Sequence, residues 1–234
     1  DPTIFKSIPI RIFGIMNNVT LLAVPLFIFM GTILEKSGIA AKMLENMAQA
    51  FRGTRGGLSV SIIIVGALLA ASTGIVGATV VTMGLMSLPI LIKQGYEKDF
   101  SSGLVASTGT LGQIIPPSIA LVLLGDVMSN AYQRAQNNMG IFSQQTVTVG
   151  DLFIGAIVPG ILICAGYLFY TIFKNSNNPY IKDNFTKPSI NKYELFKTLA
   201  LPIFLIILVL GSIFAGVATP TAVSYTHLTL PTIE

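Results

Sequence analysis

The chain has 234 residues, of which 52% are hydrophobic and 10% charged, with a net charge of +4, one cysteine and one histidine. Soluble domains carry charges on about a quarter of their residues, so this composition excludes an ordinary soluble protein and predicts a membrane protein. One cysteine and one histidine exclude a disulfide framework and a His/Cys metal cluster, and no basic stripe interleaves with aromatic residues to bind nucleic acid.

The first 55 residues are expected to hold one membrane span and one surface helix. Residues 1–17 form a short N-terminal segment without a signal peptide, and the missing initiator methionine predicts a fragment. Residues 18–55 hold a span at 18–34, kinked at Pro25, and then a segment at 39–51 whose apolar residues recur at helical spacing. That segment is interpreted as an amphipathic helix in the membrane interface. A short connector helix fits the same pattern equally well.

Residues 56–92 carry no charged side chain, and small and polar residues gather in their middle, at Ala70–Thr79 (AASTGIVGAT). A membrane span needs about 20 apolar residues, so this stretch is too short to cross twice and too long to cross once. Two helical arms of about 15 residues each would instead enter, pass the midplane and return. Lipid leaves the backbone groups of such a turn unpaired, so the turn must line a cavity enclosed by protein. The stretch predicts a re-entrant helical hairpin, an element that builds transporter sites.

The next uncharged stretch, residues 100–125, is one span long but is interrupted at Gly109–Ser118 (GTLGQIIPPS). Pro116 and Pro117 remove two backbone donors and disfavour helical geometry in the residue before them, so a continuous helix cannot form. The sequence therefore predicts a broken transmembrane helix. One transport unit is assigned to residues 56–126, with the hairpin at 56–92 and the broken helix at 100–126.

The remaining residues predict two further spans and their connections. An Asn/Gln-rich external loop is assigned to 127–151, and the two spans, at 152–173 and 198–218, fall within 152–221. A loop at 174–197 carries five lysines and is expected in the cytoplasm. Residues 222–234 have neither the apolarity of a span nor the charge of a membrane flank, and they are interpreted as a foreign tail.

Basic residues also orient the hairpin. Arg52 and Arg55 precede it and Lys93 follows it, so the positive-inside rule places both of its ends in the cytoplasm, as a re-entrant element requires. Lys6 and Arg11 would then be external, which goes against the rule.

The two uncharged stretches exclude most kinds of site. They contain no titratable acid or base, and Asp126 at the predicted outer edge is the nearest carboxylate, so proton coupling is disfavoured. No Ser-His-Asp set can be assembled, because the histidine lies in the C-terminal tail, and no phosphate-binding GxxxxGK[ST] occurs, so neither an enzyme nor an ATP-driven motor is predicted.

Neutral oxygen atoms remain available. Hydroxyl groups are found at the hairpin tip and around the helix break, and glycines there allow carbonyl groups to turn inward; unwound carbonyls and helix C-termini can together coordinate a monovalent cation. The helices that restart near Ala78 and Ser118 direct positive dipole ends to the same region, which suits an anionic substrate. Gly, Ser and Thr in membrane helices also serve close packing, and this alternative stays open. The hydroxyls belong to Ser72, Thr73, Thr79, Ser107, Thr108, Thr110 and Ser118.

Three motifs in order resemble the large permease subunit of TRAP transporters, the DctM-like family, and in particular its mannitol/chloroaromatic-type branch. They are LLAVPLFIFMGTILEKSGIA at 21–40, the ASTGIVGATVVTMG hairpin with its core at 72–84, and SGLVASTGTLGQIIPPSIALVLLGD at 102–126. The resemblance covers residues 8–221. It implies one half of an inverted-repeat elevator transporter, an all-α polytopic protein of the bacterial inner membrane that takes up small organic acids such as C4-dicarboxylates by sodium symport.

The resemblance also implies partners and a site. The partners are a periplasmic solute-binding protein and a small DctQ-like permease subunit, and sodium is the coupling ion with no other cofactor or metal. Thr79 and Gln113 are expected to contact substrate. The sodium site is expected at Ser72, Thr73, Gly74, Gly109, Thr110, Gly112, Pro116, Pro117 and Ser118. Alternatives are a single-chain sodium/carboxylate carrier of the wider ion-transporter superfamily, a sodium-independent channel, and a membrane scaffold that does not transport.

Overall fold

The computed structural model describes residues 2–51, 54, 56–141, 145–176 and 192–216. These residues form helices and no strand, which confirms the all-α fold class. In chain order the elements are α1 (Pro2–Met16), α2 (Val19–Lys36), α3 (Ile39–Ala50), α4 (Gly57–Thr73), α5 (Val76–Lys93), α6 (Lys98–Thr110), the 3-10 turn η1 (Leu111–Gln113), α7 (Ile119–Asn138), α8 (Val149–Ser176) and α9 (Lys192–Phe214).

Three of these helices are long and apolar enough to cross a membrane, namely α5, α8 over Val149–Asn175 and α9 over Leu195–Phe214. Helices α1 and α2 meet the same criterion only as a pair, bent by 48° at their junction. Helix α2 continues through Pro25. The polytopic membrane class is confirmed, and residues 2–16, to which the sequence analysis gave no secondary structure, form a helix.

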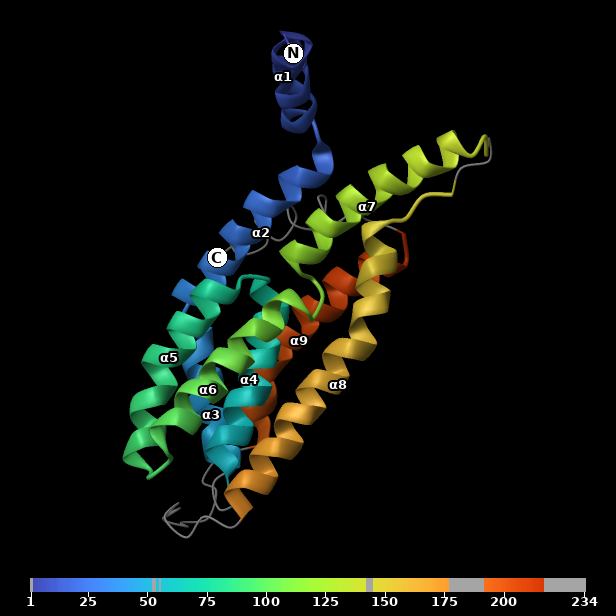
Figure 1. Cartoon of the computed structure of the whole chain (residues 1–234). Coiled ribbons are helices and arrows are strands. Elements are labelled where there is room, and N and C mark those ends of the chain that lie inside the picture. Colours follow the sequence, from blue (N-terminus) through green and yellow to red (C-terminus); the bar gives the residue numbers. More distant parts are fainter. Residues whose placement is uncertain (1, 52–53, 55, 142–144, 177–191, 217–234) are drawn as a thin grey trace.

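Helix α4 lies at the centre of the bundle. It packs against α2, α3, α5, α6, α8 and α9, and Figure 1 shows α8 and α9 running along one side of it while α5 and α6 lie on the other. Nearly all residues of α4 are buried, among them Ile62, Ile63 and Val65 in the larger of two apolar clusters. The first arm of the predicted hairpin is therefore the core of the described structure.

Helix α3 faces this core. Its apolar residues Met43, Leu44 and Met47 are buried in the same cluster. Ser61 of α4 donates a hydrogen bond of 2.9 Å to the Met47 carbonyl, and the Asn46 amide donates one of 2.7 Å to the Thr198 hydroxyl of α9. Because protein covers its apolar face, α3 matches the connector helix rather than an amphipathic helix whose apolar face meets lipid.

The prediction of an external loop at 127–151 is wrong over its first half, where α7 continues to Asn138. Residues 126–138 contain no glycine or proline, so their polar composition does not interrupt the helix. The described residues between α7 and α8, 139–141 and 145–148, are not helical. The two ends of the Gln136 amide group form hydrogen bonds of 2.9 and 2.8 Å to the backbone of Gln145. Thr148 and Asp151 then exchange side-chain-to-backbone bonds that cap the start of α8.

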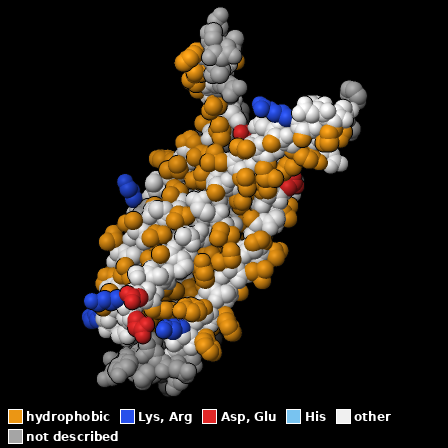
Figure 2. Space-filling model, viewed as in Figure 1, with side chains coloured by type: hydrophobic (Ala, Val, Ile, Leu, Met, Phe, Trp, Pro, Cys, Tyr) orange, Lys and Arg blue, Asp and Glu red, His pale blue; other side chains and the backbone are white. Residues whose placement is uncertain are grey.

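The lysine loop is also shorter than the predicted 174–197. Helix α8 extends to Ser176 and includes Lys174, whereas α9 begins at Lys192 and includes Lys197. Lys182 and Lys187 lie outside the described residues, as do Arg52 and Arg55. Charged side chains gather mainly toward the ends of the bundle, and hydrophobic side chains cover the flank that Figure 2 shows.

Candidate functional site

The hairpin tip is a two-residue turn pressed against the helix break. Helix α4 ends at Thr73, Gly74 follows with φ +63°, and α5 begins at Val76. A Cβ atom on Gly74 would lie 3.1 Å from the carbonyl oxygen of Pro117. The left-handed backbone and this close approach both require glycine here.

The break runs from Leu111 to Ser118, within the predicted interruption at Gly109–Ser118, because α6 continues to Thr110. After α6 the chain makes the short turn η1, a non-helical stretch with a cis peptide bond between Pro116 and Pro117, and then α7. The Ser118 hydroxyl caps α7 by accepting a hydrogen bond of 3.4 Å from Leu121 N, and it donates one of 2.8 Å to the Gln113 carbonyl. One side chain thus joins the two ends of the break.

The hairpin tip and the helix break contact each other at three positions along the chain. Gln113 Nε2 donates to the Gly74 carbonyl at 3.4 Å. A Cβ atom on Gly112 would lie 3.4 Å from the Ala70 carbonyl oxygen, and one on Gly109 would overlap the side chain of Val80. Close packing against α5 therefore requires glycine at position 109, in the last turn of α6, whereas a methyl group at position 112 would be in ordinary contact with α4.

This contact lies about halfway along the neighbouring long helices. A Cβ atom on Gly160, near the middle of α8, would lie 3.3 Å from the Ile115 side chain. Ser72 and Pro117 share a small cavity with Leu205 and Ile206, near the middle of α9. An interrupted backbone at this depth matches the re-entrant arrangement, because non-helical backbone inside a membrane has to be covered by protein.

The hydroxyl groups at the tip are buried and close together. Thr73 Oγ1 and Thr79 Oγ1 lie 3.0 Å apart, across the turn, and the Leu69 and Ile75 carbonyls are alternative acceptors for their protons. The Ser72 hydroxyl donates to the Leu69 carbonyl at 2.9 Å. Thr79 was predicted as a substrate contact, and the structure places it beside Thr73 of the predicted sodium set. A hydroxyl that donates its proton keeps lone pairs for a cation.

Two small cavities adjoin the tip. Thr73 and Thr79 line one of about 20 Å³, and Ser72 and Pro117 line one of about 10 Å³. A volume of about 10–15 Å³ suffices for one water molecule, so neither space can hold an organic acid. The surface that each cavity exposes is apolar, so a cation would bind there only if the neighbouring hydroxyl or carbonyl oxygens turned toward it. Four helix ends also meet here: the negative ends of α4 and α6 and the positive ends of α5 and α7.

Two predicted residues are directed away from the tip. Thr110 is exposed, and its hydroxyl donates to the Ser107 carbonyl of its own helix. Pro116 lines an apolar groove with α8 and α9. Sequence reasoning missed Gly31 of α2, where a Cβ atom would lie 3.1 Å from the Thr73 carbonyl oxygen. Gly31 falls within one of the quoted motifs, but the sequence around an isolated glycine in a span does not indicate which residue packs against it.

Comparison with known proteins places this architecture in a family. Residues 3–230 match the family model described as "Tripartite ATP-independent periplasmic transporter, DctM component". The match runs through residue 230 and so includes most of 222–234, whose foreign origin stays a prediction.

Individual relatives agree with the family model. The C4-dicarboxylate TRAP transporter large permease protein of Rhodobacter capsulatus is 33% identical over 92% of this chain and 48% of its own length. The ectoine permease of Halomonas elongata is 30% identical over 86% of the chain and 43% of its own length, and the sialic acid permease of Vibrio cholerae 28% identical over 90% and 45%. The chain therefore spans less than half the length of these relatives, and it belongs to the DctM family of TRAP transporter large permeases, which are transporters and not enzymes.

Proposed function

We propose that this chain supplies half of a permease that couples inward sodium flow to the uptake of a small organic acid across the bacterial inner membrane. A periplasmic solute-binding protein delivers the acid, and a small permease subunit completes the membrane complex. The family supports the coarse assignment as a transporter component. The relatives differ in the cargo that their names give, so the family does not fix the substrate.

One observation carries the choice of sodium: the hairpin tip beside the helix break is uncharged, and its Thr73 and Thr79 hydroxyl oxygens lie 3.0 Å apart there. Residues 56–92 and 100–125 hold no group that could carry a proton at this depth. Asp126 lies two helical turns beyond Ser118, and its Oδ1 accepts a hydrogen bond of 2.9 Å from Asn18. The C-terminal ends of α4 and α6 suit a bare cation, and the Thr73 and Thr79 oxygens would bind it after turning toward the small cavity beside them.

An organic-acid substrate then requires a further protein surface to complete its binding site. The cavities at the tip are too small for it, so Thr79 and Gln113 reach substrate only where another part of the complete permease closes against the hairpin. The positive ends of α5 and α7 would favour an anion at that junction.

The test is uptake by the full-length permease with its partners in proteoliposomes, driven by a sodium gradient or by a proton gradient alone. Thr73→Val keeps the side-chain shape and removes one cation ligand. It should raise the sodium concentration for half-maximal uptake by about tenfold or more, because a contact to a charged group contributes roughly 1.5–3 kcal/mol. Thr73→Ser should restore the wild-type value.

Thr108→Val is the matched control. Thr108 is buried and bonds to its own helix, as Thr73 does, but it packs under Gly66 and away from the tip. It should leave the sodium dependence unchanged. Uptake driven equally well by protons without sodium would refute the proposal, and an unchanged sodium dependence in Thr73→Val would favour a packing role for the tip.

A further inference from the structure

A second polar site lies outside the tip, at the end of the bundle from which α1 and α7 project (Figure 1). A cavity of about 930 Å³ opens there between the α1–α2 junction and α7. Its volume is in the range of small-molecule pockets. Its polar lining consists of Asn18, Asp126, Asn130, Arg134 and Asn138, over a floor of small and apolar side chains.

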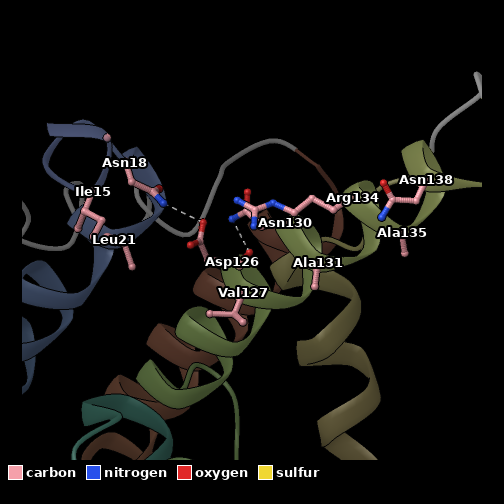
Figure 3. A pocket seen from close by; sticks show the side chains of 11 residues that line it. Ile15, Asn18, Leu21, Asp126, Val127, Asn130, Ala131, Arg134, Ala135 and Asn138 are labelled. Atoms are coloured by element: carbon pink, nitrogen blue, oxygen red, sulfur yellow. Dashed lines mark hydrogen bonds between the residues drawn. The ribbon is translucent and has the colours of Figure 1, made fainter. Parts of the chain in front are cut away.

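Helical spacing brings the polar groups of α7 together. Asp126, Asn130, Arg134 and Asn138 are each four residues apart, so they follow one face of the helix. Figure 3 shows these side chains along one edge of the cavity, with Arg134 extending back toward Asn130. This face exists only because α7 continues as a helix through residues that the sequence analysis assigned to a loop.

The two charged side chains of the cavity, Asp126 and Arg134, are not paired with each other. Asp126 Oδ1 accepts the hydrogen bond from Asn18, which leaves Oδ2 without a hydrogen-bond partner among the described residues. Asp126 and Arg134 form no ion pair, and no described side chain forms one with Arg134. Asn130 donates to the Asp126 carbonyl and keeps its amide oxygen as an acceptor.

From this arrangement we infer that the cavity binds a zwitterion, a small molecule that carries both a carboxylate and an ammonium group. The Arg134 guanidinium, which extends toward Asn130, would bind the carboxylate, because a guanidinium matches the two oxygens of a carboxylate. Asp126 would bind the ammonium group. The identification of this molecule as cargo rests on the proposed function, and it narrows the organic acid to one with a cationic group.

The nearby charges decide between substrate classes. A dicarboxylate would gain an ion pair at Arg134 but would place its second negative charge near Asp126, where like charges repel. A zwitterion has an attractive partner at both positions. The site is partly exposed, so solvent screening weakens both effects, and we expect moderate differences in affinity rather than large ones.

Two probes of similar length test this inference: 4-aminobutanoate, a zwitterion, and succinate, a dianion. Equilibrium binding to the 234-residue chain in lipid nanodiscs is measured by calorimetry in sodium-free potassium chloride. The wild type should bind 4-aminobutanoate more tightly than succinate by about fivefold or more. Arg134→Gln should weaken the binding of both probes by a similar factor, and Arg134→Lys should restore part of it.

Asp126→Asn gives the sharpest result, because asparagine keeps the Oδ1 acceptor for Asn18 while removing the charge. It should weaken the binding of 4-aminobutanoate and strengthen that of succinate, so that the preference reverses. Lys98→Gln changes an exposed cation at the other end of the bundle, at the start of α6, and should leave both affinities unchanged.

An unchanged preference in Asp126→Asn, wild-type binding by Arg134→Gln, or no binding of either probe to the wild type would overturn the inference. The measurement uses neither sodium nor uptake, so its outcome is independent of the sodium test above. If uptake is driven by sodium but neither probe binds at this cavity, the zwitterion inference is refuted and the proposed sodium coupling stands.

Discussion

The two arms of the hairpin have nearly the same length and are both apolar, yet their surroundings are opposite. Helix α4 is buried along almost its whole length, whereas only 22% of the α5 span is buried. Helices surround α4 on every side, but the main contacts of α5 are with α4 and α6. Apolarity thus identifies both as membrane helices, and only packing distinguishes the arm that meets protein from the arm that faces outward.

The exposed face of α5 has no polar character of its own. Val81 and Leu85 are 60% and 75% exposed, while Met83 between them is fully buried. A bilayer covers such a face, and so would another part of the complete permease, since the chain spans less than half the length of its relatives.

The largest difference in stability is expected between substitutions at two residues of α5 that lie on opposite sides of the helix. Met83→Ala should lower the free energy of unfolding by about 2–5 kcal/mol, because it leaves a cavity in the core. Leu85→Ala, the matched control, should change it by less than about 0.5 kcal/mol. Unfolding of both variants in mixed micelles, followed by circular dichroism, measures the difference. Equal losses would show that α5 is covered on both sides within this chain.

A smaller difference in stability is expected between alanine substitutions at two glycines, one in each arm of the hairpin. A Cβ atom on Gly66 of α4 would overlap Thr108 Cγ2, whereas one on Gly77 of α5 meets nothing within 4 Å. Thr108 could turn away only by losing its hydrogen bond to the Leu104 carbonyl. Gly66→Ala should therefore lower the free energy of unfolding by about 1–3 kcal/mol.

Gly77→Ala should leave this free energy unchanged or raise it by about 0.5–1 kcal/mol, because alanine loses less conformational freedom than glycine in a helix. The same unfolding assay serves both variants. A stable Gly66→Ala protein would mean that α4 and α6 are packed less closely than the structure shows.

The hairpin and the break could be predicted because they depend on local rules. An uncharged stretch of unsuitable length and a Pro-Pro pair restrict the backbone wherever they occur, and both observed interruptions fall within the expected ranges. Local polarity was misleading at 126–138, which are polar enough for a loop but contain nothing that ends a helix. The sequence showed no such feature until Gly140, whose φ is +71°.

The candidate site was predictable as a region and not as a set of contacts. Spacing within one helix places Ser72 and Thr73 at the tip, but the pairing of Thr73 with Thr79 depends on how sharply the chain turns at Gly74. The direction of Thr110 and Pro116, away from the tip, depends on the path of the break through η1. Distances across such a break are tertiary information, which residue spacing alone does not contain.

The smallest predicted effect concerns the end of the hairpin that faces away from the tip. Glu97, just after α5, lies 3.7 Å from Lys174 of α8, and their side chains are 62% and 46% exposed. Exposed ion pairs contribute about 0–1 kcal/mol and are screened by salt. A double-mutant cycle with Glu97→Gln and Lys174→Gln should give a coupling free energy below about 1 kcal/mol in low salt and none in about 1 M salt.

Glu45→Gln, an exposed acid on α3, is the control and should show no coupling to Lys174→Gln. A coupling that persists in high salt would mean that this end is shielded from solvent. The shielding would then come from surroundings outside the described residues, as it does for the outer face of α5. The end of the hairpin near Glu97 would in that case be covered, as its tip is. Helix α5 would then differ from α4 only in being covered by another molecule instead of by this chain.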